Sequence, residues 1–444
     1  MATNMWSKNS TLTGGTLSLS GIPASQLAKE FGTPAFFLDE DAYRSRAIAW
    51  RDGLHSQFGT HAGTIYYAAK SFICTAVAQW IADIGIGIGI DVCTGGELAA
   101  ALAGGINPAK IEFHGNNKSI AEIERAVSAG VKTIVMDSLF EIERVAAAAK
   151  KHGVRQSVML RLTPGIEAHT HEKISTAHED VKFGFSISSG SAWTAVEAVA
   201  ERPELELLGV HCHIGSQIFG TEAHEIATDR LIGFMAKYRD TYGTQLPELD
   251  LGGGFGIAYI DGEKTVEPAD VLPAIYAAVT KACAQHNLDI PLVSLEPGRN
   301  IVGPTMFTLY EVGTVKDVVI EGGTVRKYVS VDGGMSDNAR TALYDAEYTA
   351  VIAQRSSTAP LALTRVVGKH CETGDILINE IQLPSDIAPG DLLATPATGA
   401  YGRSMASNYN HVPRPPVVAV KDGKARIIVR RENEADLLSL DVKE

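Results

Sequence analysis

Four parts of the sequence carry side chains whose chemistry could combine in one site. Lys70 follows an apolar run that has the character of a buried strand, where a charged amine is costly to keep. His211 and His213 flank a cysteine, three glycines occupy positions 252–254, and Glu296 precedes a Pro-Gly turn. The set therefore contains an amine suited to attack a carbonyl, flat rings, backbone donors and a rigidly held carboxylate.

Each signal also has an ordinary explanation. A lysine at a strand end usually extends its amine into water, glycines often make a tight turn, and Glu296 with Arg299 could form a surface ion pair. His-x-His at a strand end can also bind zinc, and His169, His171 and His178 could join such a site. We disfavour zinc because no matching ligands follow the other expected strands, and we predict no metal.

Taken together, the four groups match what an enzyme must offer pyridoxal phosphate. Lys70 supplies a Schiff-base amine, one of the two histidines can lie against the cofactor ring, and the glycines let backbone N–H groups approach the phosphate. A carboxylate such as Glu296 keeps the pyridine nitrogen protonated, so that the ring can accept electrons from a carbanion. We therefore predict pyridoxal 5'-phosphate as the cofactor.

The elements that must position these residues alternate between strands and Ala-rich helices. The expected strands are 64–69, 87–91, 110–113, 132–136, 157–162, 205–213, 247–251 and 291–295. Eight such units over about 250 residues predict an α/β fold with a (β/α)8 barrel at 39–295, and an open doubly wound sheet is the alternative. Because the four groups follow the first, sixth, seventh and eighth strands, we expect them to meet at one mouth of the barrel.

A second, all-β domain is expected from residue 296 onward. The β-rich runs there are 305–312, 326–331, 363–367, 376–383, 416–420 and 426–430. The strand-like alternation of 12–38 indicates that the N-terminal segment completes this domain, which then comprises 1–38 and 296–444. The long segment 163–189 is expected to be a loop of the kind that often covers a site.

Composition excludes several classes of function. The net charge of −13 is spread along 444 residues, which argues against a nucleic-acid partner. The apolar tract 81–92 is too short to cross a membrane and contains two aspartates, and residues 1–21 show no secretory signal, so we expect no membrane association and a cytoplasmic protein. Five scattered cysteines have the character of reduced thiols.

Over essentially its whole length the chain resembles the diaminopimelate decarboxylase family, whose members are fold-type III, alanine-racemase-like pyridoxal-phosphate enzymes. Besides the motifs above, the resemblance rests on 114–118 (HGNNK), His178, 182–184 (KFG), 332–335 (DGGM), 368–372 (GKHCE) and 398–401 (TGAY).

The resemblance implies roles for individual residues. Lys70 would bind the cofactor covalently, His213 would stack on its ring, and Glu296 would meet the ring nitrogen. Further cofactor contacts would come from Ser216, Gly253, Gly254, Gly298, Arg299 and Tyr401. Substrate contacts would come from Arg299, Arg340, Tyr344, Glu372 and Tyr401, and Cys371 would be the proton donor. In this family Cys371 and Glu372 reach the site from the other subunit, so a homodimer with shared active sites is implied.

The implied reaction is decarboxylation of a small amino-acid substrate, meso-2,6-diaminopimelate, at its D-centre to give L-lysine and CO2, the last step of lysine biosynthesis. Arg340 offers a clamp for a distal carboxylate and Glu372 a partner for a distal ammonium. A decarboxylase of ornithine, lysine or arginine on the same fold is the alternative, and an acidic residue in place of Arg340 would mark it. A non-catalytic carrier of pyridoxal phosphate would not need Cys371 and Glu372, and a zinc hydrolase would lack the cofactor's yellow colour.

Overall fold

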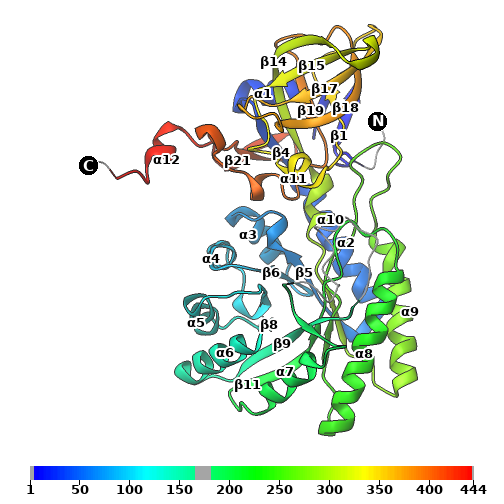
Figure 1. Ribbon diagram of the computed structural model, residues 1–444, viewed down its shortest axis with the longest axis vertical. Helices are drawn as coiled ribbons and strands as arrows, with labels where there is room; N and C mark the ends of the chain where they lie inside the picture. Colours follow the sequence, from blue (N-terminus) through cyan, green and yellow to red (C-terminus); the bar gives the residue numbers. More distant parts are fainter. Residues whose placement is uncertain (1–4, 166–181, 443–444) are drawn as a thin grey trace. The chain divides into compact units, whose positions relative to one another are not determined.

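The computed structural model describes residues 5–165 and 182–442, and the chain divides into two compact units (Figure 1). We call them the barrel unit, residues 46–256 and 266–298, and the β unit, residues 1–45, 257–265 and 299–444. The sequence-based boundaries were 39–295 for the barrel, and 1–38 with 296–444 for the β-domain. The compact units differ from them at residues 39–45, 257–265 and 296–298.

The barrel unit is a closed ring of eight parallel strands. They are β5 (Ala62–Ala68), β6 (Ile88–Val92), β7 (Ile111–Phe113), β8 (Thr133–Met136), β9 (Gln156–Thr163), β11 (Leu205–His211), β12 (Glu248–Asp250) and β13 (Leu292–Leu295). Pairing of β8 with β9 and of β13 with β5 closes the ring, and the two-residue strand β10 (Phe185–Ser186) adds to β9. All eight strands lie where the sequence predicts them, so the expected barrel is confirmed and the open sheet is excluded.

Helices lie around the outside of these strands (Figure 1). They are α2 (Glu40–Phe58), whose first six residues belong to the β unit, α3 (Thr75–Ile84), α4 (Gly95–Ala103), α5 (Ile120–Ala129), α6 (Leu139–His152), α7 (Ser191–Ala200), α8 (Glu222–Tyr242) and α9 (Pro268–His286). The sequence encodes their ends locally: Ser119 and Glu122 form a capping box at the start of α5, and Gly130 ends it with left-handed backbone. Strands covered in this way are buried on both faces, as β6 is at all five positions.

The β unit is built around a nine-stranded sheet. Its strands are β4 (Ala35–Asp39), β14 (Met306–Val319), β15 (Val325–Val331), β16 (Val351–Ile352), β17 (Leu361–Val367), β18 (Ile376–Pro384), β19 (Leu392–Thr395), β20 (Val417–Lys421) and β21 (Lys424–Val429). The N-terminal strand β4 lies between β14 and β20, and Phe37 is in register with both Phe307 and Val418. The N-terminal segment therefore completes this sheet, as expected.

The rest of the N-terminal segment differs from a plain run of strands. The short strands β1 (Ser10–Thr13), β2 (Thr16–Leu19) and β3 (Ile22–Pro23) form a separate sheet, and the helix α1 (Ala24–Phe31) follows. Leu27 of α1 is fully buried in a core cluster with Leu17 and Phe37. Burial of this apolar helix face against the sheet explains why the segment is not strand throughout.

No helix within residues 5–165 and 182–442 is both long and apolar enough to span a membrane. Most of the expected covering loop 163–189 lies outside the described residues, and so do His169, His171 and His178.

Candidate active site

Lys70 lies just beyond the end of β5, in a single turn of 3-10 helix at Ala69–Ser71, and its side chain is half-buried. Its charge acts on several neighbours in the barrel unit, among them Asp91 and Cys93. Burial raises the pKa of Asp91, against the charges of His114 and Lys70, which lower it. Burial and Asp91 likewise raise the pKa of the Cys93 thiol, and Lys70 opposes them. Lys70 is thus a cation close to buried acidic groups of the barrel unit.

The glycine run forms a place where three backbone segments meet. A Cβ atom at Gly253 would lie 2.2 Å from the carbonyl oxygen of Glu296, and one at Gly254 would lie 2.5 Å from that of Gly215. Gly252 and Gly254 also have positive φ angles of 67° and 102°. Only glycine fits such close approach, and a backbone without side chains is suited to contact a phosphate group.

His213 lies beside this run rather than on a strand. Strand β11 ends at His211, two residues before the end of the expected strand 205–213, so His213 lies in the loop that follows. The Gly253 N–H donates to His213 Nδ1 at 3.3 Å. Burial, followed by the charge of Lys70, lowers the pKa of His213 well below its ordinary value, so the ring is neutral. A flat neutral ring beside the glycines suits stacking on an aromatic cofactor.

Glu296 is held at the centre of the barrel unit by two histidines. His114 Nε2 lies 3.0 Å and His211 Nε2 lies 3.1 Å from the same carboxylate oxygen, Oε1. The Glu296 backbone N–H donates to the carbonyl of Gly252 at 2.8 Å, which ties the carboxylate to the glycine run. Burial acts to raise the pKa of Glu296, but His114 and His211 outweigh it, and the pKa lies well below the usual value.

Further buried carboxylates surround this group. Asp91, Glu112 and Asp250 all lie on barrel strands with side chains that are at most 1% exposed, and burial raises the pKa of each. Several of their oxygens, the ring nitrogens of His211, His114 Nε2 and Glu296 Oε1 have no well-formed hydrogen bond. Because buried polar atoms are normally satisfied, the cluster is suited to a polar ligand that completes it.

A metal ion is the other ligand that this cluster could accommodate. The donor atoms of His114, His211 and Glu296 lie within 4.8 Å of one another. This grouping differs from the expected zinc set, because it uses His211 without His213 and brings in a carboxylate and a histidine from other strand ends. Geometry alone therefore does not choose between a metal and a pyridine ring.

Gly298 brings the loop after β13 to the end of β5. A Cβ atom there would lie 2.7 Å from Ala68 Cβ and 3.0 Å from Ser71 Oγ. The segment that carries Glu296 therefore packs directly against the segment that carries Lys70. Ser216 is half-buried in the loop that follows β11, whose Gly215 contacts the glycine run.

The β unit contains a second cluster, made of arginines and tyrosines. Arg299 Nη1 donates to Tyr259 Oη at 2.5 Å, and Arg340 Nη1 donates to Tyr348 Oη at 2.5 Å. The guanidinium of Arg340 lies over the ring of Tyr259 at 4.4 Å, and that of Arg299 lies over Tyr401 at 4.7 Å. Tyr259 thus contacts both cations.

Arg340 is buried, with 6% of its surface exposed, and among the described residues no carboxylate forms an ion pair with it. Burial acts to lower its pKa, but the phenols of Tyr259 and Tyr348 raise it above the ordinary value. The cation is therefore stabilised by rings and hydroxyl groups alone. Such a site can bind a carboxylate through charge-assisted hydrogen bonds.

Three of the expected substrate residues lie elsewhere in the β unit. Tyr344 is half-buried at the end of the short helix α11 (Arg340–Tyr344), and Cys371 and Glu372 are exposed in the turn between β17 and β18. The Cys371 N–H donates to Asn410 Oδ1 at 3.2 Å. This turn offers its thiol and carboxylate to the outside of the chain.

Sequence reasoning missed several residues of both clusters. His114 was noted only within a motif, although its place directly after β7 matches that of the other strand-end residues. Asp91 and Glu112 were not proposed as part of the site, although charged residues inside short buried strands are a recognisable signal. Tyr259 and Tyr348 carried no signal, because each depends on contacts with distant arginines.

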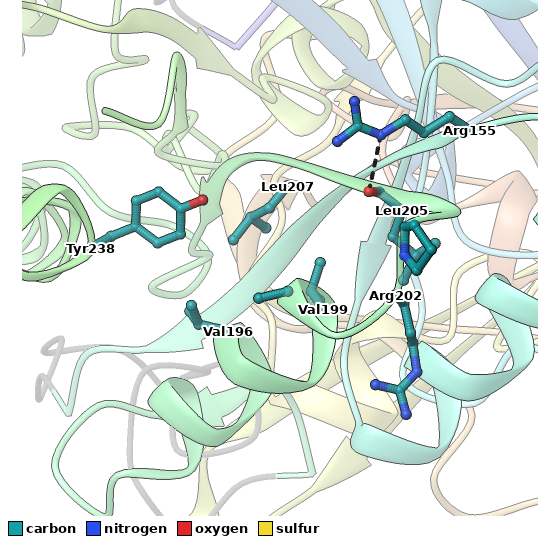
Figure 2. A pocket seen from close by; sticks show the side chains of 9 residues that line it. Arg155, Val196, Val199, Arg202, Leu205, Leu207 and Tyr238 are labelled. Carbon is teal, nitrogen blue, oxygen red and sulfur yellow. Dashed lines mark hydrogen bonds between the residues drawn. The ribbon is translucent and has the colours of Figure 1, made fainter. Parts of the chain in front are cut away.

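A separate cavity of about 140 Å³ lies between α7, α8 and the starts of β9 and β11 (Figure 2). Arg155 at its rim donates to the carbonyl of Leu205, and Arg202 pairs with Glu143. The cavity is at the N-terminal end of these strands, whereas active sites of such barrels lie at the C-terminal end. We assign it no part in the chemistry.

Comparisons with known proteins favour the pyridine ring of pyridoxal phosphate over a metal ion. Residues 42–303 match the family described as pyridoxal-dependent decarboxylase, pyridoxal binding domain. The diaminopimelate decarboxylase of Mycobacterium tuberculosis is 49% identical over 100% of this chain and 99% of its own length, and that of Bacillus subtilis is 42% identical over 96% and 95%. The crystal structure of the M. jannaschii diaminopimelate decarboxylase matches this chain with a TM-score of 0.91 and 29% sequence identity, and the match covers 99% of this chain and 98% of that one. That protein has also been crystallised with L-lysine.

Proposed function

The chain belongs to the diaminopimelate decarboxylase family of pyridoxal-phosphate-dependent carboxy-lyases, and we propose that it converts meso-2,6-diaminopimelate to L-lysine and CO2 by decarboxylation at the D-centre. The observation that carries the choice of substrate is Arg340, a buried guanidinium that has no carboxylate as an ion-pair partner among the described residues. A substrate with an amino-acid group at each end supplies that carboxylate while its other end reacts.

The barrel unit has the groups that pyridoxal phosphate needs. Lys70 is the proposed covalent attachment point, the Gly253–Gly254 backbone with Ser216 the phosphate site, and Glu296 the ring-nitrogen partner. The crowded glycines and the unsatisfied polar atoms around Glu296 support this assignment. When bound, the cofactor supplies an electron sink for the electron pair that stays on the substrate carbon when CO2 leaves.

The protein's own residues would orient the cofactor and bind the substrate. Neutral His213 would cover one face of the bound ring, and ionised Glu296 would keep the ring nitrogen protonated. We assign cofactor contacts also to Gly298, Arg299 and Tyr401. We assign the distal carboxylate to Arg340 and Arg299, with Tyr344 and Tyr401 as further substrate contacts.

We also propose that Cys371 and Glu372 act in the site of a partner subunit, Cys371 as proton donor and Glu372 as the partner of the distal ammonium. Support comes from their exposure in the turn between β17 and β18. This makes the enzyme a homodimer with shared sites. The five cysteines, all within the described residues, form no disulfide, which supports a reducing, cytoplasmic location.

The substrate assignment is tested by kcat/KM for meso-diaminopimelate, L-lysine and ornithine. A buried guanidinium left unmatched costs about 3–5 kcal/mol, so we expect roughly two to three and a half orders of magnitude in favour of meso-diaminopimelate. An enzyme that handles ornithine or L-lysine equally well would instead be a decarboxylase of basic amino acids.

The shared site is tested by mixing two inactive variants, Lys70→Ala and Cys371→Ala, under conditions in which subunits exchange. A mixed dimer contains one site free of both substitutions, so part of the activity should return. Mass spectrometry verifies the exchange, and verified mixed dimers without activity would show that each site is built from one chain.

A further inference from the structure

His114 differs from the other buried histidines in the number of carboxylates around it. Its Nε2 lies 3.0 Å from Glu296 Oε1 and 3.6 Å from Glu112 Oε2. Glu112 lies on β7 and is in register with Asp91 on the neighbouring strand β6. Asp250 completes the group, since its carboxylate approaches both Glu112 and Glu296. Four carboxylates thus share one buried region, and an imidazole stands between two of them.

The two histidines that contact Glu296 carry different charges. Burial acts to lower the pKa of His114, but Glu296 and Asp91 outweigh it and the pKa lies well above the ordinary value. Burial dominates at His211, where the pKa falls to about 4. The rings are 4.8 Å apart, so two positive charges side by side would also repel each other. His114 is therefore the imidazolium and His211 the neutral ring.

Both imidazoles approach the same oxygen of Glu296, Oε1, which leaves Oε2 outside these two contacts. A carboxylate in an acidic interior tends to take up a proton, as the raised pKa values of Asp91, Glu112 and Asp250 indicate. Glu296 escapes this tendency because its contacts, first with the cation His114 and then with His211, lower its pKa. Without that cation, burial would favour a neutral carboxylic acid at this position.

We propose that His114 is a positioning residue for the cofactor, and that its imidazolium keeps Glu296 ionised and aligned for the pyridine nitrogen. The proposal rests on the proposed function in that it takes pyridoxal phosphate as the ligand of Glu296. His114 itself acts through Glu296. Its contribution is specific to the ring nitrogen and does not extend to the phosphate or to Lys70.

The test compares two ligands that differ only at this nitrogen: pyridoxal phosphate and its 1-deaza analogue, which has a C–H group there. Full-length enzyme is freed of cofactor with hydroxylamine, and the dissociation constant of each ligand is measured by quenching of tryptophan fluorescence. The parent should prefer pyridoxal phosphate, and Glu296→Gln should remove most of that preference.

We expect His114→Leu and His114→Gln each to reduce the preference by roughly ten- to a hundredfold, the range that a hydrogen bond to a charged group is worth. Glutamine keeps an N–H donor but not the charge, and it guards against a leucine variant that fails to fold. His224→Gln is the matched control: His224 is buried, stacked on Phe255 at 5.2 Å and hydrogen-bonded to the Gly253 backbone, so its loss can affect both ligands alike but not the ring nitrogen alone. It should keep the parental ratio.

Three outcomes would overturn the proposal. Equal weakening of both ligands in the His114 variants would show a purely structural role. A parental ratio in His114→Gln would show that the charge is not needed. A parent without preference would show that Glu296 does not act on the nitrogen. Failure of the proposed function would look different, because the parent would then bind neither ligand and show no Lys70-dependent absorbance.

Discussion

The barrel unit and the β unit bury charge in opposite ways. In the barrel, Asp91, Glu112, Asp250 and Glu296 are gathered around His114, so carboxylates outnumber cations. In the β unit, two guanidiniums are placed against tyrosine rings and hydroxyl groups, and among the described residues Arg340 has no carboxylate partner.

We propose that this difference separates reaction from recognition. A carboxylate-rich interior sets the proton positions that the cofactor ring needs, and its charges can be balanced by a proton on a histidine. A buried arginine stays charged under all physiological conditions, and where no carboxylate of the described residues pairs with it, as at Arg340, an incoming anion can balance its charge. The β-unit cluster is therefore suited to a substrate carboxylate, and the barrel cluster to the chemistry.

The largest effect should come from the barrel. Lys70→Ala should remove the absorbance of lysine-bound cofactor and lower turnover by more than roughly a thousandfold, because no other amine replaces the attachment point. Circular dichroism should stay unchanged, since the side chain is only half-buried. Lys151→Ala, at an exposed ion pair with Glu124, is the control and should behave as the parent. Turnover near the parental rate in Lys70→Ala would disprove the attachment.

The β-unit counterpart is Arg340→Ala. Loss of the guanidinium should lower kcat/KM for meso-diaminopimelate by about two to three orders of magnitude while the low activity on L-lysine changes little. The selectivity ratio should therefore narrow. Arg430→Ala, at a surface pair with Asp436, gives the matched control. An equal loss on both substrates would mean that Arg340 supports the fold rather than the distal carboxylate.

A smaller effect is expected from the tyrosines that hold the arginines. Tyr259→Phe removes the acceptor of Arg299 but keeps the ring under Arg340. Loss of one hydrogen bond to a charged group should cost about 1.5 kcal/mol, or roughly tenfold in kcat/KM. Tyr348→Phe should do the same through Arg340. Because Tyr259 acts through Arg299, adding Tyr259→Phe to Arg299→Ala should cause no further loss, and additive losses would contradict that coupling.

The smallest effect concerns acid, to which the two units should respond with opposite sign. Burial lowers the pKa of His224 in the barrel to about 4, so the folded state favours the neutral ring. His224 therefore makes the folded protein less stable as the pH falls from 6.5 to 4. Burial raises the pKa of Asp337 in the β unit to about 7, so its contribution falls as the pH rises from about 4 to 7.

Each contribution changes by about 1 kcal/mol or less between pH 6 and pH 7. The measurement is the free energy of unfolding by urea at both pH values. The quantity compared is the unfolding free energy of the variant minus that of the parent. For His224→Gln this difference should be larger at pH 6 than at pH 7, and for Asp337→Asn it should be larger at pH 7 than at pH 6. Parallel pH profiles of parent and variant would show that the residue keeps its ordinary pKa in the fold.

Much of the architecture was predictable because it is encoded locally. Short apolar runs, helix caps and glycines at helix ends define the strands and helices, and all eight barrel strands occur where the sequence indicates. The resulting order of strands and helices already implies a barrel, and it also places Lys70, the glycine run and Glu296 directly after strands. The helix α1 was missed because its helical form depends on burial against a sheet.

The tertiary structure decided which residues meet. Closure of the ring through β8–β9 and β13–β5 brings His114 from one strand end and His211 from another to the same oxygen of Glu296. Tyr259 contacts both Arg299 and Arg340, which lie far from it and from each other in the chain. The sequence determines the chemical groups and the local elements that carry them. The charge state of His114 and the cation binding of Tyr259 arise only from neighbours that folding supplies, because burial and Coulomb interactions depend on distance in space.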